Sequence, residues 1–167
     1  MTDFFEITVE SELAAHGSFA ACAKGESMRP MLRGGKDMVV IVPLPERLKK
    51  YDVILFKDNL GRYVLHRIVK IKDTTYITRG DNTYFVEYVK HDKIIGILSK
   101  YNKNGKSYDV NSFSYRFYAR CRVFFYPVRK LYIGARRRIS ALLRKIFKKR
   151  NLRHSSYRSY CILTVFR

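Results

Sequence analysis

Five short apolar runs, separated by turn residues, constrain the fold of this chain more than any other feature. The runs are rich in β-branched, aromatic or other apolar side chains and have the length of a strand rather than a helix. Proline, glycine, aspartate and asparagine fill the gaps, and the segment Asn59–Gly61 is typical of a hairpin loop. We therefore expect a mainly β domain with strands at residues 37–42, 52–57, 62–71, 74–79 and 94–100.

Helical patterns flank this strand-rich region on both sides. Residues 3–15 carry apolar side chains at three- and four-residue spacing, and His16 and Gly17 provide a stop signal. Residues 128–149 form a longer amphipathic pattern in which basic residues separate the apolar positions. Residues 151–167 show no such pattern, and we expect them to be loosely ordered.

The charge distribution divides the chain into two parts. Residues 1–109 contain 18 basic and 14 acidic residues, whereas residues 110–167 contain 16 basic residues and no acidic residue. We interpret 1–109 as a catalytic domain and 110–167 as a basic, aromatic and amphipathic extension. The stretch 128–149 is a candidate for binding an anionic membrane surface, with nucleic acid as the less favoured partner. A helix packed on the domain with a solvated basic face is the third interpretation.

The cysteines and the apolar runs indicate where such a protein works. Cys22, Cys121 and Cys161 are widely spaced, so they predict neither a metal site nor a disulfide framework and favour a reducing compartment. No apolar run approaches the about 20 residues that cross a bilayer, and the N-terminus lacks a signal-peptide pattern. We expect a cytoplasmic protein, peripheral at the membrane. The sequence has no phosphate-binding glycine loop and no metal-ligand spacing, so we expect no cofactor and no metal.

A serine lies in the segment Gly25–Leu32, between a glycine and a proline. Gly25 permits an unusual backbone angle before Ser27, and Pro30 fixes the chain after it. Such a segment can be an ordinary turn with an exposed serine, or it can hold a hydroxyl at a strand edge beside an extended peptide. These residues alone do not separate the two interpretations.

Three further blocks follow this segment in order along the chain. They are Asp52-Val53-Ile54-x-Phe56, His66-Arg67-Ile68-Val69 and Arg79-Gly80-Asp81-Asn82. Together with Gly25-x-Ser27-Met28-x-Pro30-x-Leu32, they make residues 24–98 resemble the signal peptidase I superfamily, which also contains the LexA-type self-cleaving proteases. Bacterial signal peptidases and LexA-like proteins usually carry a lysine where this chain has His66. The sequence is therefore most similar to the endoplasmic-reticulum, archaeal and sporulation-type branch, which uses a Ser–His pair.

The resemblance implies a signal-peptidase-like β-barrel or sheet that carries a serine peptidase site. Ser27 would be the nucleophile, and His66 would be the general base that takes its proton. The backbone N–H of Ser27 would be the first donor of the oxyanion site, in a turn that includes Gly25 and Met28. Some family members carry a hydroxyl at the position of Gly25, so a second donor here must come from the backbone or from elsewhere.

The alternation of residues 62–71 indicates the environment of His66. On a strand, His66 shares a face with Val64 and Ile68 and is partly buried. Partial burial favours the neutral imidazole that a general base needs. A structural histidine at a sheet surface is the alternative interpretation.

An imidazole base is commonly oriented by a carboxylate, and the sequence offers two. Asp81 matches the Gly-Asp motif of the family, and Glu87 lies where the endoplasmic-reticulum members carry a further acidic residue. The sequence does not decide which of them contacts His66, and Asp81 has the alternative role of capping its own turn. Asp37 and Asp52 match structural positions of the family, and we expect them only at the turns where strands begin.

The function that the resemblance implies is that of a serine endopeptidase with a Ser–His dyad or triad, which cleaves leader or signal-type peptides after small residues. One alternative is a LexA-like regulator that cleaves itself, although His66 replaces the usual lysine. Another is a non-catalytic basic protein that binds membrane or nucleic acid. The complete Ser27, His66 and carboxylate set argues against that second alternative. The sequence leaves the substrate protein and the oligomeric state open.

Overall fold

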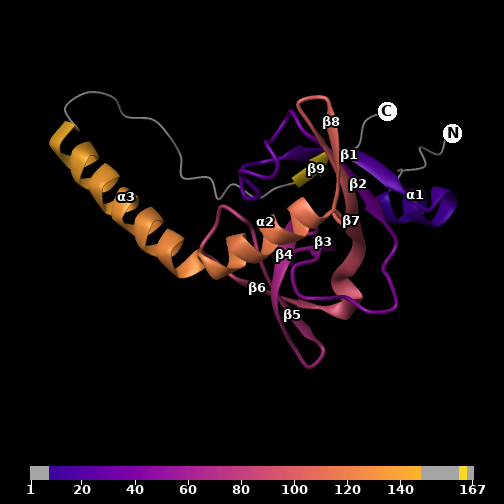
Figure 1. Ribbon diagram of the computed structural model, residues 1–167. Coiled ribbons are helices and arrows are strands. Elements are labelled where there is room, and N and C mark those ends of the chain that lie inside the picture. The colour runs from indigo at the N-terminus through magenta and orange to yellow at the C-terminus, as the bar shows by residue number, and fades with distance from the viewer. Residues whose placement is uncertain (1–7, 148–161, 165–167) are drawn as a thin grey trace, which may run out of the picture.

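The computed structural model describes residues 8–147 and 162–164 and shows a mainly β protein (Figure 1). Within this part of the chain, nine strands form one antiparallel sheet, which confirms the expected fold class. The helices are α1 (Val9–His16), α2 (Phe113–Phe124) and α3 (Tyr126–Phe147). The strands are β1 (Phe19–Lys24), β2 (Met38–Val42), β3 (Val53–Lys57), β4 (Tyr63–Lys72), β5 (Thr75–Arg79), β6 (Glu87–Lys90), β7 (Ile94–Lys103), β8 (Lys106–Asp109) and β9 (Ile162–Thr164).

All five predicted strands form, as β2, β3, β4, β5 and β7. The hairpin loop expected around Asn59 joins β3 to β4, where Lys57 pairs with Tyr63. The sequence does not predict β1, β6 or β8. β1 consists largely of small side chains, and β6 and β8 have four residues each, so their patterns are weak and the edges beside them decide the pairing.

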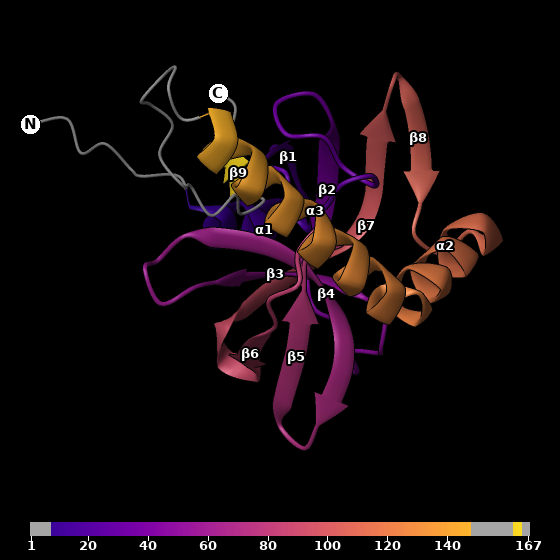
Figure 2. The ribbon, with the colours of Figure 1, turned by 90° about the vertical axis from the view of Figure 1, so that its left-hand side faces the viewer.

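Six of the strands close into a ring. The order β3-β7-β2-β1-β9-β4 returns to its start because β4 also pairs with β3. β5 and β6 extend the sheet from the second half of β4, and β8 pairs with β7. Figure 2 shows the β4–β5 hairpin projecting from the rest of the sheet. In this ring, β9 lies between β1 and β4.

Alternation along the strands builds two hydrophobic clusters. On β4, Leu65 belongs to the larger cluster, whereas Val64 and Ile68 belong to the smaller one. Because neighbouring strand residues point to opposite faces, His66 shares the face of Val64 and Ile68, as predicted. Arg67, the next residue, points to the other face.

α1 begins later than the predicted 3–15, because a reciprocal capping box at Thr8 sets its first turn. Residues 1–7 lie outside the described part of the chain. Gly17 ends the helix in the left-handed conformation, with a φ of 67°, as the stop signal predicts. The helix packs into the larger hydrophobic cluster through its buried side chains, Val9 and Leu13.

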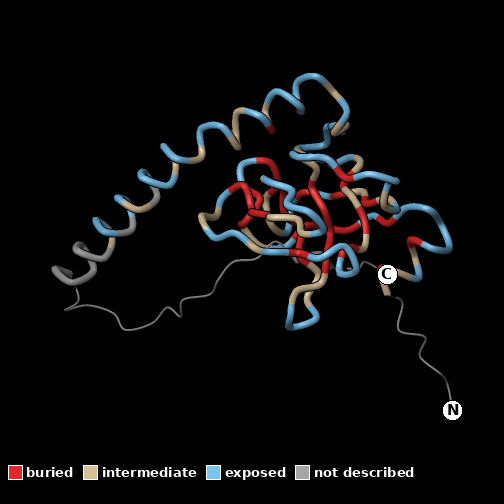
Figure 3. Tube along the Cα trace, turned by 90° about the horizontal axis from the view of Figure 1, so that it is seen from below, coloured by how far each residue is buried: buried red, intermediate tan, exposed pale blue. Residues whose placement is uncertain are grey.

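The two C-terminal helices differ in how they meet the sheet. α2, which the sequence pattern does not predict, buries Tyr115 and Ala119 in the larger cluster, so the hydrophobic core extends past the predicted boundary at 109/110. α3 follows and extends away from the sheet, and most of its side chains whose burial is described are exposed (Figures 1 and 3). It matches the helix predicted at 128–149, of which residues 148 and 149 lie outside the described part. Neither α3 nor another described helix is long and apolar enough for a membrane span.

β9 contradicts the loose order expected for residues 151–167, at three positions. Ile162–Thr164 pair with β1 on one side and with Val64 of β4 on the other. The rest of that segment lies outside the described residues. A three-residue strand carries no detectable alternation, so the two edges beside it decide its pairing, and the sequence pattern gives no sign of it.

Candidate active site

Ser27 lies in a tight turn directly after β1. Gly25 has a φ of 81°, which confirms the unusual backbone angle expected before the serine. Gly34 packs against this turn so closely that a Cβ there would lie 2.5 Å from the Gly25 carbonyl oxygen. Ser27 is 1% exposed, and Met28 is buried in the larger hydrophobic cluster. The interpretation of this segment as a surface turn with an exposed serine is therefore wrong.

His66 reaches the serine from the middle of β4, where it pairs with Ile54 of β3. Its Nε2 lies 3.1 Å from Ser27 Oγ, and the residue is 3% exposed. The Phe56 ring packs against the imidazole in an edge arrangement, with ring centroids 6.2 Å apart. The fold thus brings together two residues that are 39 positions apart in the sequence.

Glu87 supplies a carboxylate on the other side of the imidazole. Its Oε2 lies 2.6 Å from His66 Nδ1. An ionised carboxylate only accepts hydrogen bonds, so Nδ1 carries the proton and Nε2 is left to accept the hydrogen of the Ser27 hydroxyl. The Glu87 side chain is 26% exposed, so this end of the chain of contacts reaches solvent. The contact sets the tautomer that a general base requires.

Strand register explains why Glu87 meets His66. Ile68 of β4 pairs with Thr78 of β5, and Thr78 pairs with Glu87 of β6. Cross-strand partners share a face of the sheet, so Glu87 lies on the same face as Ile68 and His66. Of the two carboxylates that the sequence offers, Glu87 is the one at Nδ1.

Asp81, the other candidate, faces the other side of β4 and does not contact His66. Its Oδ1 accepts a hydrogen bond from Arg67 Nε at 2.9 Å, and its Oδ2 accepts one from Arg67 Nη2 at 2.8 Å. Oδ2 also accepts the O–H of Tyr118 at 3.0 Å. Since Arg67 directly follows His66 on a strand, the two side chains point to opposite faces, and each takes its own carboxylate.

The Arg67–Asp81 ion pair is fully buried, with the two residues 0% and 4% exposed. Arg67 Nη1 also donates to the Tyr115 hydroxyl at 3.1 Å and to the Tyr51 carbonyl at 3.0 Å. Burial by itself would raise the pKa of Asp81, but the charge and hydrogen bonds of Arg67 hold that pKa below its ordinary value. Burial acts to lower the pKa of Arg67, and the Asp81 carboxylate raises it above its ordinary value. Both groups therefore stay charged at neutral pH.

The turn Gly80–Asn82 connects this ion pair to the serine. The backbone N–H of Asn82 donates to the Ser27 carbonyl oxygen at 2.6 Å. Gly80 lies so close to the site that a Cβ there would be 3.0 Å from both Ser27 Cβ and His66 Nε2. Sequence reasoning misses this packing role of Gly80 and the pairing role of Arg67. The only sequence signal is the block Arg79–Asn82. Its aspartate is a plausible catalytic carboxylate as long as its ion pair with Arg67 is not known.

The junction of α2 and α3 lies over the same turn. Arg122 Nη2 donates to the Asp81 carbonyl at 2.9 Å, and Arg129 Nη2 donates to the same oxygen. The Tyr126 hydroxyl donates to the Tyr84 carbonyl at 2.9 Å. The first turn of α3 is thus fixed to the candidate site, while the rest of the helix extends outward (Figure 1).

The residues expected in the oxyanion turn have conformational roles. Gly25 supplies the left-handed backbone, and the buried Met28 side chain anchors the turn. The backbone N–H of Ser27 belongs to this turn and stays the first candidate donor for a developing oxyanion. Asp37 and Asp52 lie at strand starts, as expected. The Asp37 carboxylate pairs with Arg33 Nη2 at 2.7 Å, and Asp52 accepts the backbone N–H of Lys49 at 2.7 Å.

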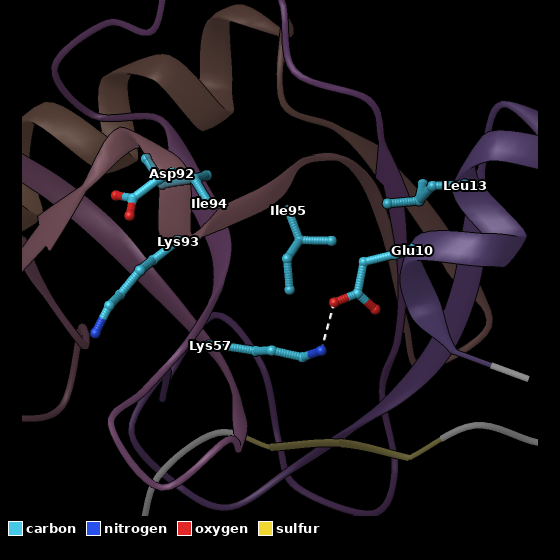
Figure 4. Close-up of a pocket in the computed structure, with 7 residues that line it drawn as sticks. All are labelled: Glu10, Leu13, Lys57, Asp92, Lys93, Ile94 and Ile95. Carbon is cyan, nitrogen blue, oxygen red and sulfur yellow. Dashed lines mark ion pairs between the residues drawn. The ribbon is translucent and has the colours of Figure 1, made fainter. Parts of the chain in front are cut away.

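Two surface hollows are lined by described residues of the sheet domain. Figure 4 shows one between α1 and β7, where Lys57 Nζ lies 2.6 Å from Glu10 Oε1. Another is lined by the β3–β4 hairpin and by β6, and it includes Glu87. Among the described residues, no three histidine, cysteine, aspartate or glutamate side chains gather as a metal site would need.

The chain matches no protein-family model, no curated protein and no solved structure. Its function therefore has to be inferred from its own residues and their arrangement. The strongest guide is the contact between a serine, a histidine and a glutamate that come from three separate elements.

Proposed function

We propose that this protein is a serine endopeptidase in which Ser27, His66 and Glu87 act as a triad. The observation that carries the proposal is the chain of contacts from Glu87 through the imidazole to Ser27, with distances of 2.6 Å and 3.1 Å. A carboxylate, an imidazole and a hydroxyl in this order make the hydroxyl nucleophilic. The resemblance of residues 24–98 to Ser–His signal peptidases supports the same chemistry.

The first half of the reaction forms an acyl-enzyme. Ser27 Oγ bonds to the carbonyl carbon of the substrate as its proton passes to His66 Nε2, and Glu87 stabilises the imidazolium. Backbone N–H groups of the serine turn, beginning with that of Ser27, stabilise the negative carbonyl oxygen. His66 then gives its proton to the leaving amine, and the peptide C–N bond breaks.

Water completes the cycle at the same three residues. His66 takes a proton from a water molecule as the water oxygen attacks the ester carbon. The ester bond to Ser27 breaks, the carboxylic acid product leaves, and the proton returns from Nε2 to Oγ. No other proton carrier is needed in either half.

The substrate class comes from the resemblance. We infer a leader or signal-type peptide that is cleaved after small residues, as in the signal peptidases that residues 24–98 resemble. A self-cleaving regulator would use the same three residues on a bond of its own chain. A non-catalytic basic protein would gain nothing from the aligned contacts of Ser27, His66 and Glu87, which makes it the weakest of the three.

A peptide library with small residues before the scissile bond tests the proposal, with products identified by mass spectrometry. Ser27→Ala and His66→Ala should each lower kcat by about 10⁶-fold, and the double variant should be no worse, because the pair acts as a unit. Ser18→Ala, at an exposed position just before β1, is the matched control and should keep full activity. Cleavage by Ser27→Ala at the wild-type rate would refute the proposal.

We propose an anionic membrane surface as the partner of α3. Its exposed apolar side chains recur at three-, four- and seven-residue spacing and so share one face, and basic residues flank them. From residue 110 onward the chain has no acidic residue to oppose the attraction. Each base near an anionic surface contributes about 1 kcal/mol, in addition to apolar burial. The exposed apolar residues are Val128, Leu131, Tyr132 and Ile139.

Co-sedimentation with lipid vesicles tests this partner. The full-length triple variant Lys130→Glu, Arg136→Glu and Arg138→Glu should lose binding to anionic vesicles and keep cleavage of a soluble peptide. The matched control reverses the charge of three exposed lysines of the sheet domain, Lys36, Lys49 and Lys50, and should still bind. Equal binding to neutral vesicles would refute an electrostatic attachment. Salt-dependent binding to DNA without vesicle binding would favour the nucleic-acid alternative.

A further inference from the structure

A third strand lies between the strand that precedes Ser27 and the strand that carries His66. β1 leads into the turn of Ser27, and β4 carries His66. β9 lies between them, with Lys24 of β1 and Val64 of β4 both paired with Ile162. The place between β1 and β4 is thus filled by a strand from near the C-terminal end of the chain (Figure 1).

The two edges that β9 covers face each other across the ring. On its other side, β1 pairs with β2, and the first half of β4 pairs with β3. Without β9, no other strand of the described residues would lie beside the backbone N–H and C=O groups of these two inner edges. Such a slot between two edges suits any extended peptide, because the backbone groups that it pairs are present in every sequence.

The slot has the position that a substrate strand needs. Its pairings end at Lys24, three residues before Ser27, and at Val64, two residues before His66. A peptide that pairs along these edges is led directly to the serine hydroxyl and the imidazole. Ser27 and His66 are 1% and 3% exposed in the arrangement that contains β9.

We propose that Ile162–Thr164 is an internal ligand of this slot, which excludes a substrate strand until it is displaced. The inference rests on the proposed peptidase function for its kinetic consequence but not for the binding itself. β9 runs antiparallel to both β1 and β4, and its three residues pair with Cys22, Ala23 and Lys24 rather than with Ser27. These residues therefore block the approach to the nucleophile and do not present their own peptide bonds to it.

Occupation of the slot by Ile162–Thr164 should raise KM and leave kcat unchanged. Substrate binds only the fraction of molecules in which the slot is open, so a slot that is nine-tenths occupied weakens the apparent affinity about tenfold. The tail is part of the same chain, which makes the competition independent of protein concentration.

Two truncations test the inference. A chain that ends at Cys161 lacks β9, whereas the matched control ends at Thr164 and keeps it. We expect the first to lower KM about tenfold at constant kcat, and the control to behave like the full chain. Leu163→Pro in the full chain tests the same point with every other residue present, since proline lacks the N–H of a paired strand, and Leu163→Ala is its control.

A binding measurement keeps the inference separate from the peptidase proposal. A fluorescent peptide of residues 160–167 should bind the Ser27→Ala chain that ends at Cys161, and the same peptide N-methylated at Leu163 should not, by fluorescence anisotropy. Peptide binding without cleavage of any substrate by wild-type protein would support the slot and refute the peptidase. Cleavage with equal KM in all chains, and no binding of the tail peptide, would overturn the inference.

Discussion

Two neighbouring residues of β4 each meet a carboxylate, on opposite faces of the strand, and the two pairs are built differently. His66 contacts Glu87, whose side chain is partly exposed and lines a surface hollow. Arg67 contacts Asp81 in a pair that is buried at both ends and bonded to tyrosines of α2. The first pair joins a titratable ring to a carboxylate near solvent, and the second joins two permanent charges inside the protein.

The difference separates chemistry from positioning. A general base has to gain and lose a proton in each cycle. His66 can do so because its partner, Glu87, is a carboxylate near solvent that does not depend on a fixed charge on the imidazole. A buried ion pair cannot change its charge without leaving its partner uncompensated, so it is suited to hold a fixed geometry. Asp81 acts through the turn Gly80–Asn82, which bonds to the carbonyl of Ser27. One strand thus supplies the proposed base on one face and the support of the proposed nucleophile on the other.

Glu87→Gln should break the first pair with the largest effect on activity. A neutral amide does not fix the proton on Nδ1 or stabilise the imidazolium, so we expect kcat to fall about 10³-fold, which corresponds to about 4 kcal/mol. Peptide cleavage at saturating substrate measures the loss, and the melting temperature should stay within a few degrees of wild type.

Glu10→Gln is the matched control for this change. Glu10 also accepts a hydrogen bond from a residue of β4, the hydroxyl of Tyr63 at 2.7 Å, but it lies on α1. Its substitution should leave kcat unchanged. If Glu87→Gln kept wild-type activity, His66 would work with Ser27 as a simple dyad.

Asp81→Asn should break the second pair, and here we expect the main effect on stability rather than on activity. The substitution leaves Arg67 charged and buried without its partner, for which we expect a decrease of about 3–5 kcal/mol in the free energy of unfolding. Urea unfolding at pH 7 measures it. Asp58→Asn removes the partner of the more exposed Arg62 and should cost no more than about 1 kcal/mol.

Activity distinguishes the two carboxylates further. Asp81→Asn molecules that are folded should cleave substrate far better than Glu87→Gln molecules, because the imidazole keeps its own partner. A stable Asp81→Asn protein with a 10³-fold lower kcat would contradict this division and return Asp81 to the orienting role that the sequence left open to it.

Five of the strands could be predicted because they depend on local patterns, whereas the pairing of Ser27 with His66 is implied by the resemblance of blocks spread over residues 24–98. The alternation around His66 places it on a buried face, and the glycine before Ser27 marks the strained turn. The choice between Asp81 and Glu87 depends on the register of β4, β5 and β6, which no single segment encodes. Asp81 and Glu87 are both close enough to His66 in the sequence to reach it. Only the pairing of the strands places them on opposite faces of β4.

The unpredicted elements share a physical reason. α2 is basic and aromatic without a clear apolar stripe, and its place is decided by Tyr115 entering the core beside Arg67. β9 has three residues and is defined by the two edges that it joins. Long-range partners fix such elements, so their own sequences carry little sign of them.

The pH dependence of stability sharpens the comparison. The pKa of Asp81 is held below its unfolded value, which is about 3.9. Its contribution is therefore fully present above about pH 4 and is lost as the pH falls through the lower, folded pKa. Wild type should lose up to about 1.4 kcal/mol per pH unit more than Asp81→Asn in this range, by thermal unfolding between pH 5 and pH 2. Parallel curves for the two proteins would show that Asp81 is not the charged partner of Arg67.

Tyr118→Phe should have the smallest effect, and it tests whether α2 belongs to the support of the site. The Tyr118 hydroxyl donates to Asp81 Oδ2 at 3.0 Å, and burial together with the nearby carboxylate raises the pKa of this phenol above its ordinary value. Removal of the hydroxyl takes away one hydrogen bond to a buried charge and leaves the Arg67 contacts in place, so we expect a loss of about 1–2 kcal/mol in the free energy of unfolding. Tyr132→Phe, at an exposed position on α3, is the matched control and should change nothing. The effects of Tyr118→Phe and Asp81→Asn on the free energy of unfolding should also be non-additive. In Asp81→Asn the Tyr118 hydroxyl has lost its charged acceptor, so its removal should cost less than in wild type. An equal loss in both backgrounds would mean that α2 stabilises the sheet through packing alone and does not help Asp81 to hold the turn against Ser27.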